Sequence, residues 1–304
     1  MSKPGVSVII PAYNAGPWLK EAIDSVRAQT FQDWELIVVN DGSTDNTAQV
    51  AREHSDPRIH VIDQVNSGVS AARNTGIAMA RGGIIGFLDA DDAMLPDNLQ
   101  QKVDLMLKTG VDWVFGDMIP CDPHLQPKGG VMTGTDGDVK SMLLLNVGTV
   151  VPIACSNVLA RRHCFEQGVA FDTTLSNSAD QDFTLQLAHR FSYRHLSAAL
   201  GKYRVLPSSM SKNVLRYQED HLRFFKKVRQ QGHLANPNFR RTCMANVYWA
   251  IGGTWWRQAR KPLKAVPFFF RALALSPAVL ARPLLKRFTG CKGTGVSLPK
   301  PPEQ

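Results

Sequence analysis

The sequence predicts an α/β fold built on a mostly parallel sheet with helices on both faces. Short β-branched runs alternate with segments of helical apolar spacing through the first part of the chain, which is the pattern of repeated strand–helix units. Each expected strand is apolar throughout, as is typical of strands buried on both faces. Polar residues follow the end of each strand, where ligands bind in sheets of this kind.

The expected elements follow one another at short intervals. Strands and helices are predicted in alternation at residues 6–10, 18–28, 35–39, 44–53, 59–62, 67–80 and 84–88. Further strands are predicted at residues 111–115 and 153–159, and a helix opens near residue 179. Residues 117–138 are rich in Pro, Gly and Asp, and we interpret them as either a mobile loop or a hairpin.

The charge distribution divides the chain into two parts. Residues 1–220 hold 19 Lys and Arg against 25 Asp and Glu, whereas residues 221–304 hold 16 Lys and Arg against the single acid Glu303. Such an asymmetry in charge indicates two structurally different parts of the chain. We predict a globular domain at 1–220, a basic helical extension at 221–288 and a disordered tail at 289–304.

Several functional classes lack their signatures in this sequence. There is no GxGxxG after the first strand, no GxxxxGK[ST] and no GxSxG, which disfavours a dinucleotide-binding fold and excludes a P-loop and the usual α/β hydrolase elbow. The five cysteines show no CxxC spacing. Since no signal peptide or 18-residue apolar run is present, we predict a cytoplasmic protein without a transmembrane helix.

Three carboxylates gather directly after the expected strand at 84–88. Asp89, Asp91 and Asp92 lie within four residues, and carboxylates crowded at the end of a buried strand repel one another. A divalent cation such as Mg²⁺ or Mn²⁺ that also binds a diphosphate would offset this charge. Taken alone, the triplet could equally be a turn or a helix N-cap.

Four sequence blocks together carry a family resemblance. They are residues 6–14 (VSVIIPAYN), 38–45 (VVNDGSTD), 68–76 (GVSAARNTG) and 88–92 (LDADD). In this order and spacing, over about the first 100 residues, they resemble the family 2 glycosyltransferases. The resemblance implies the GT-A (Rossmann-like) fold, a nucleotide-diphosphate sugar donor, a divalent metal and inversion of the anomeric centre.

The resemblance also implies site residues. It implies a nucleotide site made of Pro11, Ala12, Tyr13, Asn14, Asp41, Arg73 and Asp89. In it Tyr13 would stack on the base, Asp41 would accept a hydrogen bond from the base, and Asp91 would bind the metal. Read singly, Tyr13 could be a core aromatic, Asp41 a turn former and Arg73 a surface charge.

A second acidic segment supplies the candidate base. Residues 179–182 read ADQD and open a helix, where acids are ordinary partners of the helix dipole. The family places a Glu-Asp pair here whose second acid is the catalytic base, so the resemblance assigns this role to Asp180. Ala179 departs from the pattern, and Asp182 is the second choice.

The sequence indicates the roles of a few other polar residues less specifically. Arg204 resembles part of the closing block of the family domain, where it would help to hold the diphosphate, and it is equally consistent with an ordinary surface arginine. Cys155, His163 and Cys164 are interpreted as structural.

The basic segment after residue 220 interleaves aromatic residues with Lys and Arg. This composition is typical of an interfacial membrane element, and an anionic membrane surface is the partner we expect first. Packing on the catalytic domain is the alternative, and we expect no nucleic-acid partner.

The resemblance implies an inverting glycosyltransferase that acts on a sugar or lipid-linked sugar acceptor in bacterial surface polysaccharide or lipopolysaccharide assembly. A nucleotidyltransferase is one alternative, but residues 11–16 lack the Gly-rich basic loop that it needs. A non-catalytic nucleotide-sugar-binding protein is the other, and Ala179 is its only support.

Overall fold

The computed structural model describes residues 3–135, 137–146, 148–206 and 213–280. The chain divides into two compact units, residues 1–230 and 231–304. The boundary predicted at residue 220 falls inside helix α8 (Val214–Gln230), and the domain organisation itself stays a prediction. The tail predicted at 289–304 lies outside the described residues.

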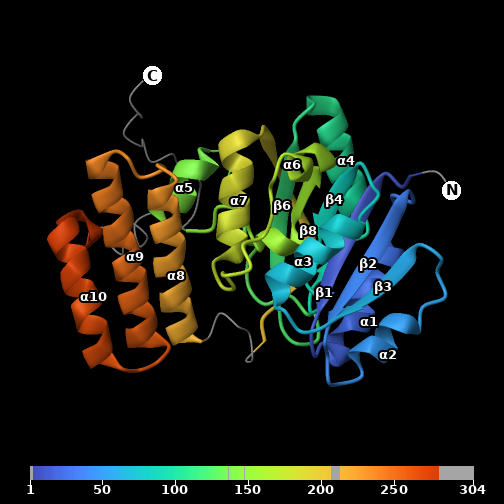
Figure 1. Ribbon diagram of the computed structural model, residues 1–304, viewed down its shortest axis with the longest axis horizontal. Helices are drawn as coiled ribbons and strands as arrows, with labels where there is room; N and C mark the ends of the chain where they lie inside the picture. The colour runs from blue at the N-terminus through green and yellow to red at the C-terminus, as the bar shows by residue number, and fades with distance from the viewer. Residues whose placement is uncertain (1–2, 136, 147, 207–212, 281–304) are drawn as a thin grey trace. The chain divides into compact units, whose positions relative to one another are not determined.

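The first unit is built on an eight-stranded sheet in the part of the chain that the structure describes (Figure 1). The strand order is β3-β2-β1-β4-β7-β6-β8-β5. The strands are β1 (Val6–Ala12), β2 (Trp34–Asp41), β3 (Ile59–Gln64), β4 (Ile84–Phe87), β5 (Ala93–Met94), β6 (Trp113–Cys121), β7 (Val158–Arg161) and β8 (Tyr193–Arg204). The α/β class predicted from the alternating runs is confirmed.

Helices of the first unit flank this sheet. They are α1 (Gly16–Arg27), α2 (Thr47–Arg52), α3 (Val69–Met79), α4 (Asn98–Thr109), α5 (Val139–Leu145), α6 (Arg162–Glu166), α7 (Ala179–Arg190), α8 and the 3-10 turn η1 (Ala154–Ser156). Val6, Val8 and Ile10 of β1 share one core with apolar residues of α1, α2 and α4. On the opposite face, Phe87 of β4 contacts Phe171 and Phe183 at centroid distances of 5.2 and 5.5 Å. Burial on both faces explains why these strands are apolar throughout.

The second half of the sheet departs from the predicted elements. The strand expected at 153–159 is instead η1 followed by β7, which pairs antiparallel with β4 and β6. Strand β8 is an addition to the predicted elements; most of its residues are only partly buried or exposed, and the fully buried ones lie near its C-terminal end. Of the two alternatives for 117–138, the hairpin is present at residues 118–132: β6 continues to Cys121, and the chain returns through antiparallel bridges from Met132 to Met118 and from Pro127 to Cys121.

Strands β1 to β4 are mutually parallel where they pair, so their carboxyl ends lie at one edge of the sheet. The loops that carry the four sequence blocks leave this edge. Ala12 pairs with Asn40 at the end of β1, and Asp41 pairs with Gln64 at the end of β2. The predicted convergence of the site residues on one edge therefore follows from the strand order.

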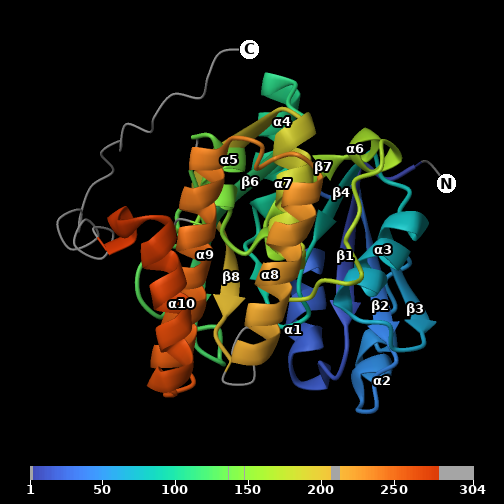
Figure 2. The same ribbon diagram turned by 60° about the vertical axis from the view of Figure 1, so that its left-hand side comes forward.

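The second unit is helical in its described part. It holds α9 (Pro237–Arg257), α10 (Pro262–Leu275) and the 3-10 turn η3 (Pro277–Leu280). Figure 2 shows α9 and α10 lying side by side, and they pack against each other. Among the described residues, none of the helices combines the length and the apolar character that crossing a membrane requires.

Candidate functional site

The centre of the candidate site is the side chain of Arg73 on α3. Its Nη2 lies 2.6 Å from Asp89 Oδ1, and its Nη1 lies 3.3 Å from Asp180 Oδ1. The guanidinium is 4% exposed, so the alternative of a surface helix charge is wrong. Asp89 follows β4 and Asp180 lies in the first turn of α7. One buried cation thus joins two candidate carboxylates from distant parts of the sequence.

Two consecutive residues of η1 hold the same two acids. The Cys155 thiol donates a hydrogen bond to Asp180 Oδ1 at 2.8 Å, and Ser156 Oγ accepts one from the Asp89 backbone N–H at 3.0 Å. Cys155 is predicted to be structural from the sequence, where its spacing gives no sign of a contact with Asp180. The structure adds it to the candidate site.

Asp180 is half-buried in this cluster. Burial raises the pKa of its carboxyl, Arg73 opposes that shift, and the charge of Asp89 adds to it. A carboxylate whose pKa is moved toward neutral pH is a better proton acceptor than an exposed aspartate. The environment of Asp180 therefore suits general base chemistry.

The loop of residues 89–92 is anchored by Arg204 at the end of β8. The backbone N–H of Arg204 donates to Asp92 Oδ1 at 2.9 Å, and its Nε donates to the Asp91 carbonyl at 2.7 Å. Its two Nη atoms donate to the carbonyl of Pro123 and the carboxylate of Glu21. Arg204 is 1% exposed, so the surface-arginine alternative is wrong. Its donors hold the protein chain around the acidic loop.

The acidic loop carries more negative charge than its protein partners offset. Burial and the charge of Asp89 raise the pKa of Asp91 to about 6. Burial and the charges of Asp91 and Asp89 raise that of Asp92 well above its usual range. Carboxylate oxygens are the ligands that Mg²⁺ and Mn²⁺ prefer. The donor set therefore fits a hard cation.

The described residues do not form a metal site of three or more His, Cys, Asp or Glu side chains. Such a cation would take its remaining ligands from outside the protein. This is the usual mode of Mg²⁺, which binds through one or two carboxylates together with phosphate oxygens and water. The assignment of Asp91 to such a cation stays a prediction.

Five of the seven residues predicted to bind the nucleotide lie at the ends of β1 and β2. Pro11 and Ala12 are buried at the end of β1, whereas Tyr13 is 51% exposed, so the core-aromatic alternative for Tyr13 is wrong. Asn14 has a positive φ of 48°. Its Oδ1 accepts from the Thr44 backbone N–H at 2.9 Å, which joins the two loops and leaves the Tyr13 ring accessible.

Asp41 is 3% exposed, and its carboxylate accepts three hydrogen bonds from the chain. Oδ1 accepts from Gln64 Nε2 at 2.7 Å and from the Ser67 backbone N–H at 2.9 Å, and Oδ2 accepts from the Gly68 backbone N–H at 2.8 Å. These contacts fix the loop that leads into α3 and Arg73. Asp41 therefore stabilises a loop, in agreement with the alternative that it is a turn-forming residue. The predicted hydrogen bond from a nucleotide base to Asp41 stays a prediction.

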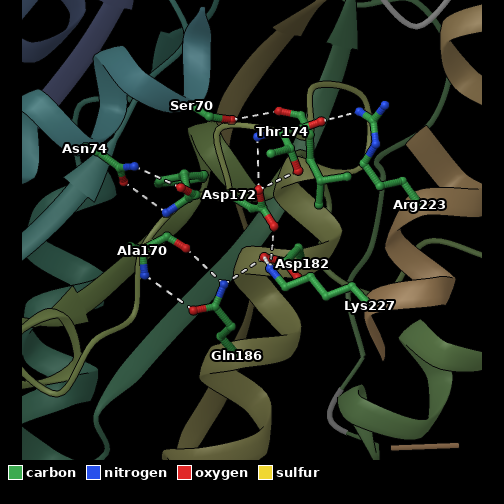
Figure 3. Close-up of polar contacts among 11 residues, drawn as sticks. Ser70, Asn74, Ala170, Asp172, Thr174, Asp182, Gln186, Arg223 and Lys227 are labelled. Atoms are coloured by element: carbon green, nitrogen blue, oxygen red, sulfur yellow. Dashed lines mark hydrogen bonds and ion pairs between the residues drawn. The ribbon is translucent and has the colours of Figure 1, made fainter. Parts of the chain in front are cut away.

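Asp182 lies in a separate ion-pair network (Figure 3). Its Oδ2 accepts from Lys227 Nζ at 2.9 Å and from Gln186 Nε2 at 2.8 Å, and Lys227 also reaches Asp172 at 2.8 Å. Asp182 is 2% exposed, against 37% for Asp180. The geometry therefore favours Asp180 as the reactive acid and gives Asp182 a role in holding α7.

Helix α8 supports the segment that precedes Asp180. Asp220 Oδ2 accepts from the backbone N–H groups of Ser176 and Asn177 at 2.7 and 2.6 Å. Arg223 donates to the Thr174 carbonyl (Figure 3). These contacts were not predicted, because the charge pattern groups residues from 221 onward with the basic extension. The one available signal is that Asp220 is the last acid before the basic segment begins.

Comparisons with known proteins show the family of the chain. The model of the family described as glycosyl transferase family 2 matches residues 7–162. The uncharacterized glycosyltransferase EpsJ of Bacillus subtilis is 52% identical over 91 residues, which are 29% of this chain and 26% of that protein. The UDP-Glc:alpha-D-GlcNAc-diphosphoundecaprenol beta-1,3-glucosyltransferase WfgD of Escherichia coli is 39% identical over 113 residues, which are 37% of this chain and 45% of that protein.

A solved structure resembles the chain over most of its length. The mannosyltransferase PcManGT from Pyrobaculum calidifontis, in complex with GDP-Man and Mn²⁺, superposes with a TM-score of 0.60 at 20% identity and covers 95% of this chain and 80% of that one. This likeness supports the predicted GT-A fold. The chain spans less than half the length of EpsJ or WfgD.

Replacing Lys227 by Met should destabilise the first unit. The change leaves the buried Asp182 carboxylate without its cation, which costs about 3 kcal/mol in free energy of unfolding at neutral pH. Burial opposes ionisation of Asp172, but hydrogen bonds from Lys227 and Thr174 outweigh it and lower its pKa to about 2. This folded pKa lies below the usual value of an unfolded Asp, so the pair contributes stability above about pH 4 and loses it toward pH 2.

Chemical denaturation at several pH values measures this effect. Burial raises the pKa of Asp182 even beside Lys227, so the difference between the wild type and Lys227→Met should begin to shrink above about pH 4, where Asp182 is protonated, and should shrink further toward about pH 2 as Asp172 is protonated. Lys226→Met is the matched control, because Lys226 is exposed on the same helix. Equal losses in the two variants would contradict the role of the network.

Replacing Cys155 by Ala should change the pH dependence of turnover. The thiol hydrogen bond lowers the pKa of Asp180, so its loss should raise that pKa and move the acid limb of the kcat/KM profile to higher pH. We expect turnover at neutral pH to fall about tenfold, as for the loss of a hydrogen bond to a charged group. Cys164→Ala, also buried, is the control and should leave the profile in place. An unmoved profile in Cys155→Ala would exclude this positioning role.

Proposed function

Because the chain belongs to glycosyl transferase family 2, we propose that it transfers a sugar from a nucleotide-diphosphate donor to an acceptor hydroxyl with inversion of the anomeric carbon. One observation carries this proposal. The Arg73 guanidinium contacts both Asp89 of the acidic loop and Asp180 of α7. A donor-side acid and a half-buried proton acceptor are thereby held in one site at the carboxyl edge of the sheet.

The donor site in this proposal is the edge formed by the ends of β1, β2 and β4. Tyr13 offers an exposed aromatic face on which a base stacks. Pro11, Ala12 and Asn14 shape the pocket around that base, and Asp41 holds the neighbouring loop. Asp89, paired with Arg73, faces the ribose or the metal.

The chemical step in this proposal is a single in-line displacement. Asp180 accepts the proton of the acceptor hydroxyl as its oxygen bonds to the anomeric carbon. The bond from that carbon to the diphosphate oxygen breaks, and its electron pair leaves with the nucleoside diphosphate. Arg73 offsets part of the negative charge of Asp89 and Asp180, and Cys155 keeps the Asp180 carboxylate oriented.

A divalent metal completes the proposed donor site. A bound Mn²⁺ or Mg²⁺ ion would supply positive charge that stabilises the diphosphate leaving group. Asp91 would hold it, and the raised pKa values of the acidic loop support this assignment. The Mn²⁺ and GDP-Man bound to PcManGT support a metal-dependent donor site of the same kind.

The acceptor in our proposal is a sugar or lipid-linked sugar used in bacterial surface polysaccharide or lipopolysaccharide assembly. WfgD is named for a diphosphoundecaprenol-linked acceptor, and EpsJ is a glycosyltransferase of unassigned substrate. We therefore propose a cytoplasmic enzyme that works at the inner face of the cell membrane, where a lipid-linked acceptor is presented.

Asp91→Ala tests the donor and metal assignments together. We expect nucleoside diphosphates to raise the melting temperature of the wild type in the presence of Mn²⁺ or Mg²⁺, since ligand binding stabilises the native state. The variant should keep its fold by circular dichroism and lose the metal-dependent part of this shift. A metal-dependent shift that persists in Asp91→Ala would move the metal to another residue.

Asp180→Asn tests the base. The change keeps the shape and removes the proton acceptor, so turnover with a panel of sugar nucleotides should fall by roughly 10²–10⁴-fold. Nucleotide binding should be nearly unchanged. Asp182→Asn is the comparison, and its main expected effect is on stability. Near-normal turnover in Asp180→Asn beside an inactive, folded Asp182→Asn would transfer the role to Asp182. A wild type that binds sugar nucleotides without turnover would favour a non-catalytic binding protein.

A further inference from the structure

Helix α10 exposes an apolar stripe that none of the described residues of the second unit covers. Leu263, Val266 and Phe270 are 87, 38 and 69% exposed. With Pro267 and Ala274, which are also exposed, they follow the 3- and 4-residue spacing of one helix face. Side chains that large are normally turned inward on a packed helix.

The opposite face of α10 explains how this stripe comes to face outward. Only Ala265 and Ala272 of this helix are buried, and they lie two turns apart on the side that packs against α9. Phe269 contacts Trp249 of α9 at a centroid distance of 4.8 Å. Small residues thus make the close helix–helix contact, and the larger apolar side chains of the stripe are free for another partner.

Basic residues flank the stripe. Lys264 and Arg271 lie seven residues apart, next to the stripe on the helix surface, and stack over Trp255 and Tyr248 of α9 at 4.9 and 5.9 Å. Arg260 and Lys261 lie in the turn that joins α9 to α10. The described residues of α9 and α10 include no Asp or Glu. A surface of this charge attracts an anionic partner.

An open apolar cavity of about 390 Å³ lies on the same helix pair. It is lined by Trp249, Gly253, Trp256, Arg257 and Phe269. Trp256 is 53% exposed at this site. Tryptophan rings with one apolar and one polar edge favour the boundary between lipid headgroups and acyl chains.

From these features we infer that the surface formed by the α10 stripe, its basic flank and Trp256 binds the interface of a bilayer that contains anionic lipids. The stripe enters the boundary between headgroups and acyl chains, and Lys264 and Arg271 lie at the level of the phosphates. A second copy of this chain is disfavoured as the occupant, because it would bring two acid-free basic surfaces together. The inference deepens the proposed location at the membrane and names the surface responsible.

Vesicle co-sedimentation of the full chain tests this inference without donor or acceptor. We expect binding to vesicles of phosphatidylcholine mixed with phosphatidylglycerol, and much weaker binding to phosphatidylcholine alone. Raising the salt should weaken the binding only in part, because the Debye length falls from about 10 Å at 0.1 M to about 3 Å at 1 M while the apolar contribution is not screened.

Two charge-changing variants separate the contributions. The double variant Leu263→Glu, Phe270→Glu should reduce binding at low salt by about tenfold or more, since the two most exposed large apolar side chains of the stripe become negatively charged. The double variant Lys264→Glu, Arg271→Glu should lose the salt-sensitive part. Leu107→Glu is the matched control, because Leu107 is 68% exposed on α4 of the first unit, and it should bind as the wild type does.

A second measurement guards against misfolded variants. Brominated lipids should quench tryptophan fluorescence of the wild type, and Trp256→Phe should lose part of that quenching. Nucleoside diphosphate binding should persist in the Leu263→Glu, Phe270→Glu variant, which separates failure of this inference from failure of the proposed function. Wild-type binding by that variant, equal binding to neutral and anionic vesicles, or a dimer in light scattering that the variant abolishes would overturn the inference.

Discussion

The site depends on one buried cation that forms ion pairs with two acids. Arg73 is almost fully removed from water, and a buried guanidinium without partners would be very costly. Asp89 and Asp180 supply those partners from β4 and α7. The electrostatic requirement therefore couples the parallel half of the sheet to the helix that carries the candidate base. An error in the relative position of either element would leave a charge unpaired in the interior.

The neighbouring polar groups reinforce this arrangement from other directions. The 3-10 turn η1 contacts both acids through Cys155 and Ser156, and Arg204 fixes the acidic loop from β8. Each of these contacts comes from the half of the sheet in which β7 pairs antiparallel with β4 and β6. This half of the sheet, in which β6 also pairs parallel with β8, thus positions a site whose four sequence blocks lie in the parallel half.

This division explains what the sequence reveals and what it conceals. Asp41, Arg73 and Asp89 belong to local blocks at the ends of consecutive strands, so alternation of strands and helices is enough to predict that they converge. Cys155 and Lys227 act through contacts with residues 25 and 45 positions away. Such contacts depend on strand pairing and helix docking, which no local pattern encodes. Ala179 illustrates the same limit. The sequence shows that it replaces the Glu usual in the family, but it does not show which residues surround that position in the fold.

Helix α8 has a consequence for exchanging parts between related enzymes. Its charge composition groups it with the basic segment, whereas its contacts through Asp220 and Lys227 tie it to the residues around Asp180. In a chimera joined at residue 220, most of α8 would come from the other protein. The first unit would then lose the contact from Lys227 that supports α7. A junction placed after Gln230, where the compact units divide, would let the second unit be exchanged while the residues around Asp180, the candidate base, keep their contacts with α8.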